Sequence, residues 1–215
     1  ILGDCIQSMK SMPEKSVQTC VTSPPYFGLR DYGNDQQIGL EQTPNEFVNK
    51  LVEVFREVRR VLKDDGTLWL NLGDSYVGTG AKGEHDDPKY PQRNQSQKTA
   101  PVNQKIEGLK RKDLIGIPWR VAFALQADGW YLRQDIIWSK PNPMPEPVKD
   151  RCTKSHEYIF LLSKSPKYYY DHEAIKEDCS ENNIQDFMRR KTLNNKGKGF
   201  GTYEEARPDL ARSRS

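Results

Sequence analysis

The tetrapeptide Ser23-Pro24-Pro25-Tyr26, called here the Pro-Pro turn, carries the groups best suited to chemistry in this sequence. Because proline has no N–H group, the two prolines present carbonyl oxygens without competing donors. The serine hydroxyl and the tyrosine ring complete a pocket that can accept two hydrogen bonds from an amino group and stack on a flat ring. A nucleobase with an exocyclic NH₂ group has these requirements.

The Pro-Pro turn follows directly on a predicted strand. Residues 16–22 have the character of a short buried strand, and Gly28 together with residues 31–34 predicts a turn immediately afterwards. Open α/β sheets bind their ligands at the carboxyl ends of strands. An ordinary surface turn is the alternative interpretation, because short motifs give many false positives. The position after a strand favours a binding pocket.

Several further blocks of the sequence resemble the amino-methylating DNA methyltransferases, which modify cytosine N4 or adenine N6 with S-adenosylmethionine. Their order resembles the β arrangement of that family, in which the catalytic half precedes the cofactor-binding half. The likeness covers most of residues 1–175. The blocks that carry it are Gly3-Asp4-Cys5, Thr22-Ser23-Pro24-Pro25-Tyr26, Leu70-Asn71-Leu72-Gly73-Asp74-Ser75-Tyr76, Trp138-Ser139-Lys140-Pro141-Asn142 and His156-Glu157-Tyr158-Ile159-Phe160.

A strand–helix–strand unit is predicted around the first strand. Residues 43–46, Thr-Pro-Asn-Glu, form a capping box with proline at the first helical position. Apolar residues then recur at steps of three and four as far as Leu62, and Asp64-Asp65-Gly66 is predicted to end the helix. Residues 67–72 read as a second buried strand, parallel to the first through a right-handed crossover.

The second half of the pattern adds one helix and two strands. Pro118 opens a helix from Ile117 to Ala127. Strands are predicted over 131–138 and 157–162, the latter returning antiparallel beside the former. The expected fold class is α/β, with a Rossmann-like methyltransferase sheet that is mostly parallel, has one antiparallel strand and is incomplete in this chain.

The domain prediction assigns residues 1–178 to the catalytic part of a methyltransferase domain. Within it, residues 79–108 have almost no apolar anchors and are interpreted as a mobile insertion. Residues 179–215 are predicted to be a basic, weakly ordered tail and a candidate start of the target-recognition region. The family's glycine-rich cofactor block is absent, and in the β arrangement it would lie beyond residue 215. The chain is therefore interpreted as the catalytic half, which could be inactive alone.

The hypothesis for the chemistry concerns the amino nitrogen, which is a poor nucleophile because its lone pair is delocalised into the ring. Ser23 Oγ and the Pro24 carbonyl would accept its two hydrogens and free that lone pair, while Tyr26 stacks on a base swung out of the duplex. Positioning can supply about 7–11 kcal/mol of the barrier. Carbon-5 methylation needs an activated cysteine, and neither Cys5 nor Cys20 lies in the Pro-Pro turn.

Three polar residues are predicted to bind the cofactor. The family resemblance implies that Asp4 contacts the cofactor adenine, with an ordinary loop carboxylate as the alternative. Asn71 and Asp74 lie at the end of the second strand, so they are expected to face the same crevice as the Pro-Pro turn. A hydrogen-bonded turn residue is the alternative for Asn71.

Three other residues are predicted to contact DNA. Arg30 follows the Pro-Pro turn, and Lys140 and Asn142 follow the third predicted strand, where phosphate or base contacts are expected. His156 beside Glu157 has the chemistry of a general base. No strong base is needed before methyl transfer, so a structural role is expected for it.

Composition limits the functional classes. The net charge is only +3 at pH 7, so a DNA-binding surface must be local, as in residues 105–112 and 189–198. The four cysteines are scattered, which argues against a zinc site and favours a reducing, cytoplasmic setting. The sequence has no long apolar segment, which excludes a membrane span, and it begins at Ile1, so we expect the natural N-terminus to be missing.

The sequence thus predicts a site-specific DNA methyltransferase that uses S-adenosylmethionine, acts on double-stranded DNA and has a restriction endonuclease as a candidate partner. Serine at the head of the Pro-Pro turn favours cytosine N4, and adenine N6 is the first alternative. A non-catalytic DNA-binding fragment is the second. Methylation of RNA or of a protein glutamine amide is the third.

Overall fold

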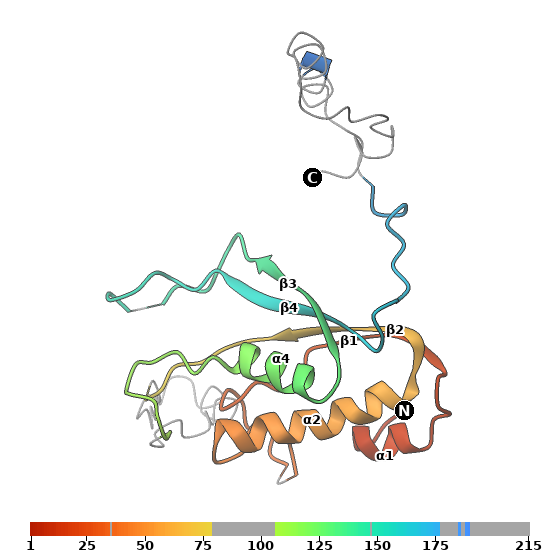
Figure 1. Cartoon of the computed structure of the whole chain (residues 1–215). Coiled ribbons are helices and arrows are strands. Elements are labelled where there is room, and N and C mark those ends of the chain that lie inside the picture. Colours follow the sequence, from red (N-terminus) through yellow and green to blue (C-terminus); the bar gives the residue numbers. More distant parts are fainter. Residues whose placement is uncertain (35, 79–105, 147, 177–184, 186–187, 190–215) are drawn as a thin grey trace. The chain divides into compact units, whose positions relative to one another are not determined.

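The computed structural model describes residues 1–34, 36–78, 106–146, 148–176, 185 and 188–189 (Figure 1). The chain divides into two compact units, Ile1–Tyr169 and Tyr170–Ser215. The predicted insertion, apart from residues 106–108, and nearly all of the predicted basic tail lie outside the described residues. The expected boundary after residue 178 therefore stays a prediction.

The described part of the first unit is built on a four-stranded sheet with the strand order β1-β2-β4-β3. The strands are β1 (Val17–Thr22), β2 (Leu62–Leu72), β3 (Tyr131–Ser139) and β4 (His156–Ser163). β1 pairs with β2 in parallel, and β4 lies antiparallel between β2 and β3. The predicted α/β sheet, mostly parallel with one antiparallel strand, is confirmed.

This topology fixes which chain segments meet at one edge. β1, β2 and β3 run in the same direction, so their carboxyl ends share an edge of the sheet. β4 runs the opposite way, so its first residues lie at that same edge. Four strand ends therefore meet there, joined to three connections from different parts of the sequence.

Two helices cover one face of the sheet, α2 (Pro44–Val61) and α4 (Ile117–Ala127) (Figure 1). Alternate residues of β2, namely Leu68, Leu70 and Leu72, are fully buried, as expected for the strand face that packs on helices. α2 supplies the largest apolar surface to this core. Its fully or nearly fully buried side chains are Phe47, Leu51, Phe55, Val58 and Val61. None of the described helices is long and apolar enough to cross a membrane.

The predicted capping box of α2 is present. Thr43 Oγ1 accepts a hydrogen bond from the Glu46 N–H at 3.2 Å, and Glu46 Oε2 accepts one from the Thr43 N–H at 3.0 Å. These bonds satisfy two N–H groups that an uncapped helix leaves without partners. Because α2 carries much of the core, the stability of its first turn affects the whole unit.

Thr43→Ala is expected to lower the free energy of unfolding by about 1 kcal/mol, because the side-chain acceptor is lost. For a protein of this size that corresponds to a fall in Tm of roughly 2–4 °C. Thermal unfolding followed by circular dichroism measures it. Glu46→Gln keeps an amide oxygen as acceptor and is the matched control, with a smaller fall. An unchanged Tm for Thr43→Ala would show that the box contributes nothing.

Two elements differ from expectation. β2 starts at Leu62, immediately after α2, rather than at Thr67. Its pairing with β1 passes from Val17–Leu62 directly to Thr19–Thr67, so the segment Asp64-Asp65-Gly66 bulges out of the ladder instead of ending the helix. The helix stops earlier because Leu62 already has an extended backbone, at φ −68° and ψ 142°.

The second difference is a short helix, α1 (Cys5–Lys10), which the sequence pattern did not predict. Six residues are too few to show a helical repeat of apolar positions. Its start is fixed instead by Asp4, whose carboxylate accepts a hydrogen bond from the Gln7 N–H at 2.9 Å.

Candidate active site

The Pro-Pro turn leaves β1 at the edge where the strand ends converge. A cavity of about 300 Å³ lies against it, near the lower end of the range of ligand pockets, about 300–1,000 Å³. The predicted DNA contact Arg30 lies on the cavity wall together with the turn. The lining residues are Ser23, Pro24, Pro25, Tyr26, Leu29, Arg30 and Tyr32.

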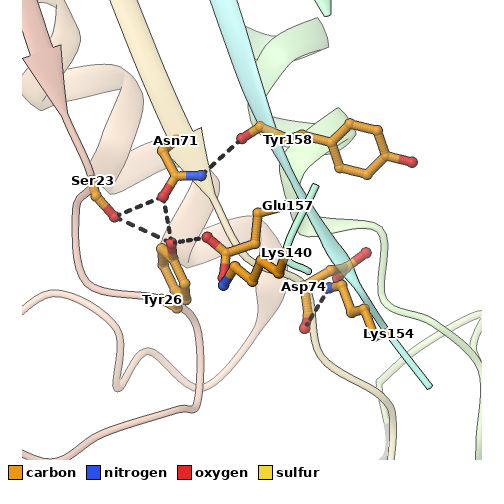
Figure 2. Close-up of polar contacts among 8 residues, drawn as sticks. All are labelled: Ser23, Tyr26, Asn71, Asp74, Lys140, Lys154, Glu157 and Tyr158. Atoms are coloured by element: carbon orange, nitrogen blue, oxygen red, sulfur yellow. Dashed lines mark hydrogen bonds and ion pairs between the residues drawn. The ribbon is translucent and has the colours of Figure 1, made fainter. Parts of the chain in front are cut away.

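A polar network connects the Pro-Pro turn to the end of β2 (Figure 2). Ser23 Oγ lies 3.2 Å from both the Tyr26 hydroxyl and Asn71 Oδ1, and the Tyr26 hydroxyl lies 2.7 Å from Asn71 Oδ1. The structure thus brings Asn71, a predicted cofactor contact, together with the two predicted catalytic side chains.

The orientation of the Asn71 amide follows from its other partner. Its Nδ2 donates a hydrogen bond to the main-chain oxygen of Tyr158 in β4, at 3.1 Å. Reversing the amide would place two oxygens face to face at that position, so Oδ1 must point to Ser23 and Tyr26. An amide oxygen can only accept, and the Ser23 hydroxyl therefore donates its proton into the network.

Glu157, at the start of β4, completes the network, and sequence reasoning missed it. Its Oε2 accepts a hydrogen bond from the Tyr26 hydroxyl at 3.0 Å, and its Oε1 forms an ion pair with Lys140 Nζ. Lys140 follows β3, so the antiparallel β3–β4 pair brings these two charges together. The sequence pattern could have indicated Glu157, because the last predicted strand is antiparallel and its first residues must therefore lie beside the carboxyl ends of the other three.

The charge states in the network follow from burial and hydrogen bonding. Burial raises the pKa of Tyr26; the Ser23 hydrogen bond opposes this effect and the Glu157 carboxylate adds to it. Burial also acts to raise the pKa of Glu157, but hydrogen bonds, chiefly from Lys140 and Tyr26, outweigh it and leave that pKa lowered. Near neutral pH the phenol is therefore protonated and the glutamate ionised.

Gly73, the residue after β2, leaves the space that the Tyr26 ring occupies. A Cβ atom at this position would lie 2.4 Å from Cε2 and 2.6 Å from Cδ2 of Tyr26. Such distances are far shorter than a van der Waals contact. The Tyr26 ring therefore packs directly against Gly73, and the hydrogen bonds of its hydroxyl fix its far end.

The comparisons with known proteins agree with this geometry. Residues 17–206 match the family model described as DNA methylase. The chain belongs to the DNA methylase family. The resemblance seen in the sequence blocks is thereby confirmed.

Two curated relatives of this chain are type II methyltransferases. M.SmaI of Serratia marcescens is 55% identical over 194 residues, which cover 90% of this chain and 65% of that protein. M.Cfr9I of Citrobacter freundii is 54% identical over 191 residues, which cover 89% of this chain and 61% of that protein. The chain therefore spans less than two thirds of the length of either relative.

Two solved structures share the fold. The PvuII DNA methyltransferase, described as cytosine-N4-specific, superposes with a TM-score of 0.55 at 17% identity, covering 88% of this chain and 61% of that chain. A candidate DNA modification methylase from Thermus thermophilus, solved with S-adenosyl-L-methionine, has a TM-score of 0.52 at 23% identity and covers 87% and 63%. At these identities the likeness supports the fold alone.

Asp74 makes structural contacts in this chain. Its carboxylate accepts hydrogen bonds from the N–H groups of Ser75, Gly116 and Ile117 at 2.9–3.0 Å. Gly116, the residue before α4, has a left-handed backbone and no side chain that could cap the helix. Asp74 supplies the capping carboxylate instead. Burial raises the pKa of Asp74, although the backbone N–H groups oppose it.

The remaining predicted site residues lie outside the polar network. Asp4 caps α1, and α1 is tied through the Met9 carbonyl to Arg60 in the last turn of α2, at the opposite end of β1 from Ser23. Asn142 is exposed in the connection after β3. The side chains of Asp4, Asn71 and Asp74 all have protein partners here, so their role as cofactor contacts stays a prediction.

Proposed function

We propose that this protein methylates an exocyclic amino group of a base in double-stranded DNA, with cytosine N4 as the preferred target and S-adenosylmethionine as the methyl donor. The observation that carries the proposal is the acceptor character of the Pro-Pro turn. The proton of Ser23 points into the network, towards Asn71 Oδ1 and the Tyr26 oxygen at 3.2 Å each, so the lone pairs of Ser23 Oγ are available to the cavity. The adjacent Pro24 contributes a carbonyl and no N–H group.

This arrangement suits an amine rather than a ring carbon. Two acceptors on the NH₂ hydrogens draw electron density back to the nitrogen and raise its nucleophilicity, so no covalent nucleophile is required. S-adenosylmethionine, when bound, supplies a methyl group on a sulfonium that is already a good leaving group. The contribution of this chain is to hold and orient the base, and positioning of this kind supplies about 7–11 kcal/mol.

The proposed target rests on the serine at the head of the Pro-Pro turn. Adenine N6 remains the alternative. Arg30 on the cavity wall, Lys140 and Asn142 are the proposed contacts to the DNA backbone around the extruded base. A restriction endonuclease partner stays a prediction.

The decisive experiment is an analysis of the methylated product. The protein in its full natural length is incubated with unmethylated genomic DNA and S-adenosylmethionine, and the digested nucleosides are separated by mass spectrometry. N4-methylcytosine is the expected product. N6-methyladenine alone overturns the cytosine assignment. Absence of any methylated nucleoside, with a folded protein and bound cofactor, overturns the proposed activity.

Ser23→Ala is expected to lower kcat about tenfold, because one neutral hydrogen bond to the amine, worth about 1–1.5 kcal/mol, is lost. Initial rates of tritium transfer to DNA measure it. Ser16→Ala is the matched control: this serine bonds the Pro13 carbonyl at the other end of β1, and its loss leaves the rate unchanged. Equal rates for both variants would remove Ser23 from the mechanism.

A further inference from the structure

Glu157 uses its two carboxylate oxygens on different partners from different parts of the fold (Figure 2). Oε2 lies 3.0 Å from the Tyr26 hydroxyl, after β1, and Oε1 is paired with Lys140 Nζ, after β3. The Glu157 side chain is 17% exposed, so the carboxylate is partly withdrawn from water. A half-buried carboxylate with two oriented partners is well placed to hold one of them still.

Of the two partners of Glu157, Tyr26 is the one whose hydroxyl also has another acceptor nearby. A phenol has one proton, and the Tyr26 hydroxyl faces both Asn71 Oδ1 and Glu157 Oε2. Asn71 Oδ1 is the nearer acceptor, at 2.7 Å against 3.0 Å for Glu157 Oε2, but it is a neutral amide oxygen that Ser23 Oγ also approaches. The charged carboxylate oxygen is the stronger acceptor of the two. The phenol proton is therefore shared between two acceptors, and Glu157 helps to fix the direction of the Tyr26 hydroxyl.

We propose that Glu157 is a positioning residue that acts through Tyr26, holding the ring that forms one wall of the base pocket. The expected effect of Glu157 on the methylation rate rests on the proposed function. Lys140 has a supporting role in it, because its ammonium group keeps the carboxylate ionised and turned towards the phenol.

The amide of Glu157→Gln cannot replace both interactions. If its oxygen faces the Tyr26 hydroxyl, its NH₂ group faces the Lys140 ammonium, donor against donor; the reverse orientation removes the acceptor from Tyr26. Glu157→Asp keeps two equivalent oxygens on a shorter stem. Glu53→Gln is the matched control, since Glu53 is an exposed carboxylate of α2 that also pairs with a lysine, Lys50.

The kinetic test is a double-mutant cycle on the full-length protein. Glu157→Gln is expected to lower kcat about tenfold with an unchanged KM for S-adenosylmethionine and only a small fall in Tm. In a Tyr26→Phe background the same substitution should change kcat less than about twofold, because the group that it acts on is gone. Glu157→Asp should recover part of the loss. Effects that simply add in the double variant overturn the inference while leaving the proposed function intact.

A spectroscopic test needs no catalysis. The ionisation of Tyr26 is obtained by ultraviolet titration as the difference between proteins with and without Tyr26→Phe. The charged groups around the phenol are Glu157 and, through Glu157, Lys140 and Lys154; the neutral Ser23 hydroxyl is a hydrogen-bond partner. Removal of the carboxylate in Glu157→Gln should lower the pKa of Tyr26. An unchanged pKa overturns the link, whether or not DNA is methylated.

Discussion

Gly73→Ala is expected to lower the rate of DNA methylation by about a hundredfold, with the S-adenosylmethionine affinity retained. The added methyl group would lie 2.4 Å from Cε2 of Tyr26, so the ring must move. A displacement of about 1 Å in a positioned reacting group can cost a hundredfold in rate. Gly73 is itself buried at a strand end, so the backbone has little freedom to yield instead.

Single-turnover rates on DNA measure this effect, and thermal unfolding separates it from loss of the fold. Gly129→Ala is a suitable control. Gly129 has a left-handed backbone at φ +98°, so alanine strains the chain, but it follows α4 at the opposite end of the sheet. That variant should lose stability and keep its rate. A normal rate in Gly73→Ala would mean that the Tyr26 ring is not part of the reacting geometry.

Asp74→Ala is expected to lower the free energy of unfolding by about 2–4 kcal/mol. Its removal leaves three N–H groups, of Ser75, Gly116 and Ile117, without their acceptor at a partly buried junction. Burying the carboxylate costs free energy and offsets part of the gain from these hydrogen bonds. The expected loss is therefore smaller than the sum of three hydrogen-bond energies. The expected fall in Tm is roughly 5–15 °C.

Chemical denaturation and calorimetry measure the Asp74 effect. Asp74→Asn retains one side-chain oxygen as an acceptor for the start of α4 and should lose about half as much. Activity of that variant, measured below its Tm, then tests whether Asp74 also serves the cofactor as the sequence predicts. A stability equal to that of the unaltered protein in Asp74→Ala would contradict the capping role.

The sequence predicted the parts of the site that are local. The Pro-Pro turn, its place after β1 and the strand end at Asn71 follow from proline chemistry and apolar patterning, which act over a few residues. The position of β4 between β2 and β3 is not encoded locally. The roles of Glu157 and of the Asn71–Tyr158 hydrogen bond depend on that position, so they could not be predicted.

Tertiary proximity also decided the outcome for Asp74 and Asp4. Asp74 lies 42 residues before Gly116, and only the fold brings its carboxylate to the start of α4. Asp4 caps a helix too short to be recognised from periodicity. In both cases a carboxylate predicted to bind cofactor has backbone N–H partners, a competition that sequence spacing cannot reveal.

The central place of β4 has a consequence for biosynthesis. β3 pairs with no strand other than β4 among the described residues, so when it leaves the ribosome its native partner is not yet present. Its partner appears only once residues up to Ser163 are synthesised, and the Tyr26–Glu157 contact then closes a loop of 131 residues. Until that moment the nascent chain exposes the edges of both β2 and β3, which is the interval in which chaperone binding or aggregation competes with folding.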